Sequence, residues 1–244
     1  MDNTETIVIV VVVVAVTLFL TVITSIRAKK KQKAFLEIAN TYTKPMLQSV
    51  FPEMEYEYNR RFDTKDYNTA GFFDYTHASG HDYVKTMYQN VPIEFNVTML
   101  EYENSDEEGT TSTFTFQGPW IVVRKGWLHS GKITVRPYKK KGLIGKLFGA
   151  KEVMTGDPVF DGTYQVYGDE NTVHVFLDKN RRDRMVEISK KHSGVYYSFE
   201  TDQIQVAYAT GNILFKSRKI KDVSTVFSNQ LNDLLDLIND VVQL

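Results

Sequence analysis

The chain has 244 residues, of which 29 are Lys or Arg, 30 are Asp or Glu and none is Cys. A composition that is 42% hydrophobic and 24% charged is typical of globular proteins and excludes disordered or collagen-like chains. The absence of Cys excludes disulfide frameworks, thiol catalysis and Cys-ligated metal sites. A net charge of −1 gives no reason to expect a nucleic-acid partner.

The N-terminal segment differs in character from the rest of the chain. All basic residues lie at or after Arg27, and the stretch from Ile7 to Ile26 has no charged residue. A helix of ~20 residues spans about 30 Å, the thickness of the hydrocarbon core of a bilayer. We therefore predict a short tail at residues 1–6 and a transmembrane helix over residues 7–26. A cleaved signal peptide fits less well, because no basic residue precedes the run and no Ala-x-Ala site follows it.

The flanks of this segment predict its orientation. Asp2 and Glu5 precede it, whereas the residues that follow are strongly basic. The positive-inside rule places a basic flank in the cytoplasm. We expect a single-pass protein of the cell membrane, with the N-terminus outside and the C-terminal domain in the cytoplasm. The basic residues expected to meet the inner membrane surface are Arg27, Lys29, Lys30, Lys31 and Lys33.

Residues 27–52 are predicted to form a basic, helical connector, and Pro45 predicts a kink or break near Lys44. Residues 53–244 are predicted to form one α+β domain, an antiparallel sheet covered by a C-terminal helix. Alternating and β-branched sequence predicts the strands. Those strands are expected at 54–60, 83–87, 93–102, 113–124, 132–136, 164–167, 173–176, 195–199, 203–208 and 213–215, with an acidic turn over 103–111 and punctuation at Gly118-Pro119.

Two helices are predicted in the second half of the chain. One covers residues 178–192, with Asp178 or Asn180 as its cap. The other is C-terminal, with Asp222 or Ser224 as its cap, and its apolar residues recur at helical spacing. They are Phe227, Leu231, Leu234, Leu235, Ile238, Val241 and Val242, opposite Asp233, Asp236 and Asp240. Because an acidic polar face does not suit a membrane surface, we expect this helix to pack on the sheet.

Two segments resemble sites with known chemistry. Gly126 to Lys132 matches part of a phosphate-binding loop, but Ile133 follows where Ser or Thr should begin a helix, so we interpret it as a hairpin turn. The second segment offers a carboxylate-and-histidine group, namely Asp74, His77, His81 and Asp82. Gly80 argues against a metal-binding helix there, and a solvated loop is the favoured interpretation. We predict no catalytic residue, no cofactor and no metal ligand.

The segment from Arg136 to Lys151 interleaves basic and large apolar residues. This pattern suits contact with an anionic membrane surface, where each basic group contributes about 1 kcal/mol. The candidate contacts are Lys139, Lys140, Lys141, Lys146 and Phe148. The alternative is a solvated hairpin loop whose apolar residues fold back onto the domain. A further basic group, at Arg181, Arg182 and Arg184, is interpreted as a solvated helix face.

The sequence from residue 157 to 188 resembles the signature stretch of an uncharacterised bacterial family with a membrane-anchored domain of unknown function. The matching positions are Asp157, Pro158, Phe160, Asp161, Tyr164, Val166, Tyr167, Arg184, Met185, Glu187 and Ile188, and Phe116-Gln117-Gly118 resembles the family's central turn. The resemblance covers about residues 35–244. It departs at Leu177-Asp178-Lys179, where the family pattern is Leu-Thr-Pro. It implies a membrane anchor and no catalytic residues.

These observations favour a membrane-anchored, non-enzymatic cytoplasmic domain that binds anionic lipid headgroups or a membrane protein. One alternative is a metal-dependent enzyme that acts on a membrane or envelope substrate. Another is a structural subunit of a membrane complex, although the Val-rich segment lacks the small-xxx-small pattern of self-associating helices.

Overall fold

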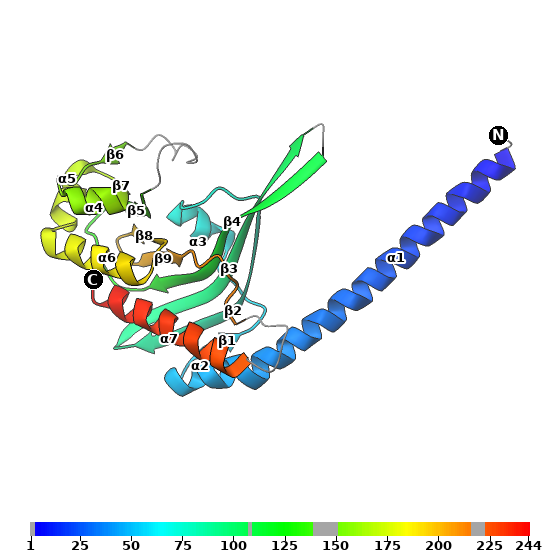
Figure 1. Ribbon diagram of the computed structural model, residues 1–244, viewed down its shortest axis with the longest axis horizontal. Helices are drawn as coiled ribbons and strands as arrows, with labels where there is room; N and C mark the ends of the chain where they lie inside the picture. The colour runs from blue at the N-terminus through cyan, green and yellow to red at the C-terminus, as the bar shows by residue number, and fades with distance from the viewer. Residues whose placement is uncertain (1–2, 107–108, 139–150, 216–222) are drawn as a thin grey trace.

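The computed structural model describes residues 3–106, 109–138, 151–215 and 223–244 (Figure 1). The fold combines one antiparallel sheet with helices packed on it and ends in a helix, so the predicted α+β class and C-terminal helix are confirmed. One helix runs through the predicted divisions at residues 6 and 26, and the division at residue 52 lies just after the end of another helix at Val50.

The chain begins with a long helix, α1 (Asn3–Ile38), followed by a π-helical turn (Ala39–Thr43) and α2 (Lys44–Val50). Lys44 N–H donates to the carbonyl of Ala39, five residues back. Pro45 then lies in the first turn of α2, where its missing N–H costs no hydrogen bond. The change of helix type therefore confirms the predicted break near Lys44.

Helix α1 leads away from the sheet (Figure 1). Its large apolar side chains Leu18, Phe19, Leu20, Val22 and Ile26 are 54–64% exposed. Across the part of the chain that the structure describes, no helix is both long and apolar enough to cross a membrane. The predicted transmembrane helix over residues 7–26 therefore has no support from the described residues.

All neighbouring strands of the sheet are antiparallel, in the order β1-β2-β3-β4-β9-β8-β5-β7-β6. Their bounds are β1 (Glu55–Glu57), β2 (His77–Tyr88), β3 (Val91–Asp106), β4 (Gly109–Val123), β5 (Ile133–Pro137), β6 (Glu152–Val153), β7 (Tyr164–Tyr167), β8 (Val195–Phe199) and β9 (Ile204–Tyr208). The two halves of the sheet meet where β4 pairs with β9.

Helices cover both faces of the sheet. Adjacent residues of β4 point to opposite faces, so Ile121 joins the core under α7 and Trp120 joins the second core under α3. Leu237 and Ile238 of α7 are fully buried, which confirms that this helix packs on the sheet. The helix bounds are α3 (Thr64–Ala70), α4 (Pro158–Thr163), α5 (Glu170–Phe176), α6 (Lys179–Lys191) and α7 (Val223–Val242).

The connection between β4 and β5 differs from its prediction. These strands do not pair, because β4 pairs with β3 and β9 whereas β5 pairs with β7 and β8. The stretch from Gly126 to Lys132 is thus a crossing loop between the two halves of the sheet, and the interpretation as a hairpin turn was wrong. Gly118-Pro119 does not interrupt β4.

Three further local predictions were wrong. Val173 to Phe176 belongs to helix α5, which Asp169 caps by accepting from Thr172 N–H at 2.9 Å. Residues 213–215 form no strand. Most of the acidic segment 103–111 continues the long β3–β4 hairpin, as the register Glu103↔Ser112 shows. The Asp178 cap of α6 is confirmed by its hydrogen bond from Arg181 N–H at 2.8 Å, whereas Asp222 lies outside the described residues.

Candidate functional site

The residues predicted to contact the membrane surface fall into two groups. The first, Arg27, Lys29, Lys30, Lys31 and Lys33, is exposed along α1 directly after its apolar part. The Lys31 ammonium lies 5.9 Å from the centre of the Phe35 ring. The second group, Lys139, Lys140, Lys141, Lys146 and Phe148, lies outside the described residues.

Two of the three arginines of α6, Arg181 and Arg182, are partly buried, whereas Arg184 is exposed. Arg181 lies over the Phe176 ring at 4.1 Å and donates to the Leu244 carbonyl at 3.3 Å. Arg182 donates to the Leu177 carbonyl at 2.5 Å, and Arg184 donates to the side-chain oxygen of Gln243 at 3.1 Å. Arg181 and Arg182 connect α6 to α5 and to the C-terminus, so the interpretation as a solvated face was wrong for these two residues and holds for the exposed Arg184.

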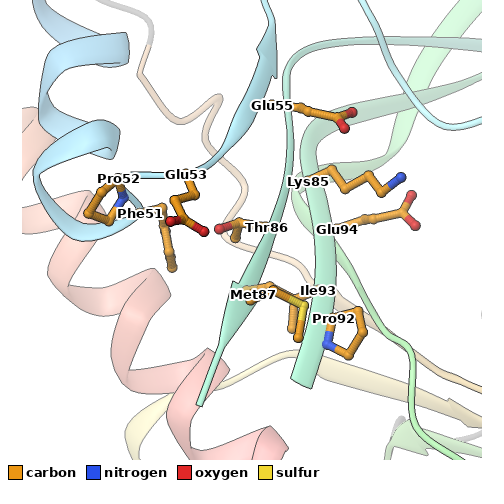
Figure 2. A pocket seen from close by; sticks show the side chains of 10 residues that line it. All are labelled: Phe51, Pro52, Glu53, Glu55, Lys85, Thr86, Met87, Pro92, Ile93 and Glu94. Carbon is orange, nitrogen blue, oxygen red and sulfur yellow. The ribbon is translucent and has the colours of Figure 1, made fainter. Parts of the chain in front are cut away.

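A groove of about 410 Å³ lies where α2 meets the edge of the sheet (Figure 2). It is close to the end of α1 and is formed by three parts of the chain: the turn after α2, strand β1 and the β2–β3 hairpin. The lining residues are Phe51, Pro52, Glu53, Glu55, Lys85, Thr86, Met87, Pro92, Ile93 and Glu94.

The groove has an apolar end and an acidic end. Figure 2 shows Met87 and Ile93 at one end, and Glu55, Lys85 and Glu94 at the other. Met87 is 56% exposed and so offers apolar surface at this end of the groove. Three carboxylates, those of Glu53, Glu55 and Glu94, and the ammonium group of Lys85 line the groove, and Arg124 pairs with Glu94 at 3.0 Å, which leaves an excess of one negative charge.

Glu94 is held firmly at the acidic end. It accepts from Tyr83 hydroxyl at 2.7 Å and from Arg124 Nε at 3.0 Å. Burial alone would raise the pKa of Glu94, but these hydrogen bonds outweigh it, so the pKa falls below its ordinary value of 4.5. Glu94 is thus a fixed negative charge at neutral pH.

The groove also borders a free strand edge. Strand β1 has three residues and pairs only with Tyr83–Lys85 of β2. Before it, the chain turns away at Phe51, whose carbonyl accepts from Met54 N–H at 3.2 Å. Within the described residues no strand pairs with Thr86–Tyr88 on this side. Such an edge is a template for pairing with another extended chain.

The four predicted metal or enzyme candidates do not come together. They were placed in a loop, but His77, His81 and Asp82 all belong to strand β2. His77 is 65% exposed and pairs with Glu103 at 3.5 Å. Asp74 instead lines a separate open cleft of about 880 Å³ with Phe73, Tyr75 and Tyr102.

His81 and Asp82 form a buried pair at a β-bulge. His81 Nδ1 lies 2.6 Å from Asp82 Oδ2, and Tyr56 hydroxyl donates to Asp82 Oδ1. Burial and the Asp82 carboxylate raise the pKa of Tyr58 to about 12, and they also raise the pKa of Tyr56. Both phenols stay protonated at neutral pH and are unsuited to act as bases, and the Tyr56 hydroxyl stabilises the carboxylate by donating to it.

Comparison with protein families identifies the family of this chain. The family model described as "Protein of unknown function (DUF3137)" matches residues 111–243, more than half of the sequence. The chain belongs to the DUF3137 family. This confirms the resemblance to a family of unknown function. The DUF3137 match begins in β4 and extends through α7, so the groove beside α2 lies outside it.

Other comparisons add little to the family assignment. A search of curated proteins finds no match to the sequence. Among solved structures, the crystal structure of the mycobacterial trehalose monomycolate transport factor A is similar at a TM-score of 0.44 and 12% sequence identity. The similarity covers 80% of this DUF3137 chain and 92% of the mycobacterial chain.

The groove could not be found from the sequence. Its lining comes from three segments whose proximity depends on the pairing of β1 with β2. The sequence predicted a strand over 83–87 but gave no signal of a groove beside it.

Proposed function

We propose that this protein is a membrane-anchored binding domain whose groove receives an extended segment of a partner protein. One observation carries the proposal: the free edge of β2 at Thr86–Tyr88 borders a groove with an apolar end and an acidic end. A partner segment there continues the line of β1 and pairs with β2 through its backbone.

The membrane anchor is part of the same proposal. Side chains such as Phe19, which is 64% exposed, would leave a large apolar surface in water if α1 were not covered. Residues 7–26 cross the membrane, and the exposed basic residues from Arg27 to Lys33 contact anionic headgroups on the cytoplasmic side. The N-terminus is then outside and the domain is in the cytoplasm.

The chemistry of the groove specifies the partner segment. Backbone pairing with an edge strand supplies affinity, and alternate side chains of the added strand supply specificity. The apolar end, where Met87 is exposed, fits an aliphatic side chain. The excess of carboxylates fits Lys or Arg at the other end. We therefore expect an extended segment in which basic and aliphatic residues alternate.

The proposal is tested with the detergent-solubilised full chain and a short fluorescent peptide of alternating Lys and Val. We expect saturable binding by fluorescence anisotropy, and an at least tenfold weaker affinity in the double variant Glu53→Lys/Glu55→Lys. The control is Glu187→Lys, which reverses an exposed charge on α6 outside the groove. Equal binding of a Glu/Val peptide, or unchanged affinity in the double variant, would contradict the proposal.

No observation in the described residues favours either alternative, a metal-dependent enzyme built on the Asp74–Asp82 segment or a structural subunit of a membrane complex. His77 pairs with Glu103, and Asp74 lines another cleft.

A further inference from the structure

A buried histidine faces carboxylates on both sides of its ring. His192 directly follows α6 and is only 2% exposed. Its Nε2 lies 3.2 Å from Asp236 Oδ2, and its Nδ1 lies 3.0 Å from Asp233 Oδ1. Tyr208 packs edge-on against the ring, with centroids 5.5 Å apart. The two aspartates belong to α7, so the cluster joins the end of one helix to the polar face of another.

This arrangement leaves one ring nitrogen without a suitable partner. A neutral imidazole carries one N–H donor and one lone pair, and a carboxylate can accept but not donate. Two states avoid placing the lone pair of His192 against a carboxylate oxygen: an imidazolium that donates from both nitrogens, or a neutral ring whose lone pair binds a cation. Within the described residues Nδ1 makes no hydrogen bond despite its proximity to Asp233. A cation bound at Nε2 would place the ring proton on Nδ1, where Asp233 is the nearby acceptor.

A cation beside Nε2 resolves the conflict. His192, Asp236 and Asp240 each offer a ligand atom, and these atoms lie within 4.8 Å of one another. With Nε2 as a ligand, the proton resides on Nδ1 and is available to Asp233. Metal-binding histidines usually donate their second N–H to a carboxylate in this way.

The charges around the cluster agree with this interpretation. The cluster has three negative charges, on Asp233, Asp236 and Asp240, and one positive charge, on Lys191. The excess is two negative charges. Lys191 Nζ lies 2.9 Å from Asp240 Oδ2 and 3.8 Å from Asp236 Oδ2. Its side chain is 51% exposed, so it can swing into solvent when another cation takes its place.

We propose that His192, Asp236 and Asp240 form a binding site for a divalent transition-metal ion, with Asp233 orienting the imidazole. A nitrogen ligand with two carboxylates suits Zn²⁺ or a similar ion better than Mg²⁺, which prefers oxygen ligands and retains its waters. The bound ion links α6 to α7 and so holds the C-terminal helix on the sheet. The site lies within the family-matched region and is independent of the groove.

The experiment is calorimetric titration of Zn²⁺ into the metal-free full chain in detergent. We expect one high-affinity site, at least tenfold weaker in His192→Asn, Asp236→Asn and Asp240→Asn. Asp233→Asn weakens binding by about 10- to 100-fold, the usual cost of losing an outer-shell partner. Lys191→Met strengthens binding, because it removes the competing cation. If the cluster is only an ion-pair network, Lys191→Met should instead lower the stability of the protein, and no metal should bind.

Matched controls separate this site from adventitious binding. Asp183→Asn changes an aspartate that also pairs with a lysine, at 2.5 Å, but lies outside the cluster. His174→Asn removes a histidine from the last turn of α5. Neither is expected to change the Zn²⁺ affinity, and circular dichroism verifies that each variant is folded. Absent Zn²⁺ binding, binding unchanged by Asp236→Asn, or binding lost in His174→Asn would overturn the site. None of these results bears on peptide binding in the groove.

Discussion

At the scale of single residues, Asp82 is a buried acidic group in an unusual backbone conformation. It is 1% exposed, and its backbone adopts a left-handed φ of 55° in the bulge between His81 and Val84. Its carboxylate accepts from Tyr56, contacts His81, and so has partners on both oxygens. The strained backbone is therefore retained because the side chain satisfies two buried groups at once.

Two substitutions of Asp82 should separate the contribution of its carboxylate contacts to stability from that of its left-handed backbone. Asp82→Ala leaves Tyr56 and His81 without their partner, and we expect it to lower the free energy of unfolding by about 3 kcal/mol. Asp82→Asn keeps an acceptor and tolerates the left-handed backbone, so its cost should be about 1 kcal/mol. Denaturant unfolding of the detergent-solubilised chain, followed by the fluorescence of the buried Trp120, measures both. Equal losses in the two variants would show that the carboxylate contacts are not decisive.

At the scale of elements, Gly118 allows β4 to pass close to the end of β9. Its φ is 154°, and a Cβ there would lie 2.0 Å from the Tyr208 carbonyl oxygen. Backbone cannot yield as a flexible side chain does, so Gly118→Ala should cost about 2 kcal/mol or more. Gly162→Ala is the control, because no atom lies within 4 Å of the Cβ added in α4. Thermal unfolding should therefore show a large decrease for the first variant and little change for the second.

The elements that sequence predicts well are those with local signals. Strands β7 and β8, the Asp178-capped α6 and the amphipathic α7 all depend on periodicity or caps within their own residues. Helix α5 was mistaken for a strand because Val173 and Val175 alternate with polar residues, whereas the Asp169 cap and the burial of Val173 and Phe176 favour a helix.

The wrong pairing predicted for β4 with β5, and the failure to predict either candidate site, have a different cause. Which strands pair is decided by contacts between distant residues, such as Ile121↔Val206, and these leave no local pattern. The same holds for the groove, which requires β1 to end beside Lys85, and for the approach of His192 to Asp236 across 44 residues. Sequence therefore predicted the α+β class and the family, but neither candidate site.

At the scale of the whole molecule, the family-matched region and the N-terminal part share one sheet. Residues of β3 lie before the match and pair along the whole length of β4, for instance Val97↔Pro119. The groove at the β1 edge and the half of the protein that holds the His192 cluster are thus joined through one sheet, whereas α1 extends away from the sheet (Figure 1). Any partner held in the groove is positioned near the end of α1.

The absence of Cys allows the proposed membrane topology to be tested in spheroplasts by single-cysteine labelling. The Asn3→Cys variant should react with a membrane-impermeant maleimide, whereas Val175→Cys, at a site that is 82% exposed on α5, should react only after permeabilisation. Phe19→Cys is decisive, because position 19 is 64% exposed in the chain alone and would be covered by lipid in a membrane. We expect it to stay unlabelled until detergent is added. Both variants are also compared in permeabilised spheroplasts. If Phe19→Cys is labelled there as fast as Val175→Cys, α1 lies in water and the anchor is excluded.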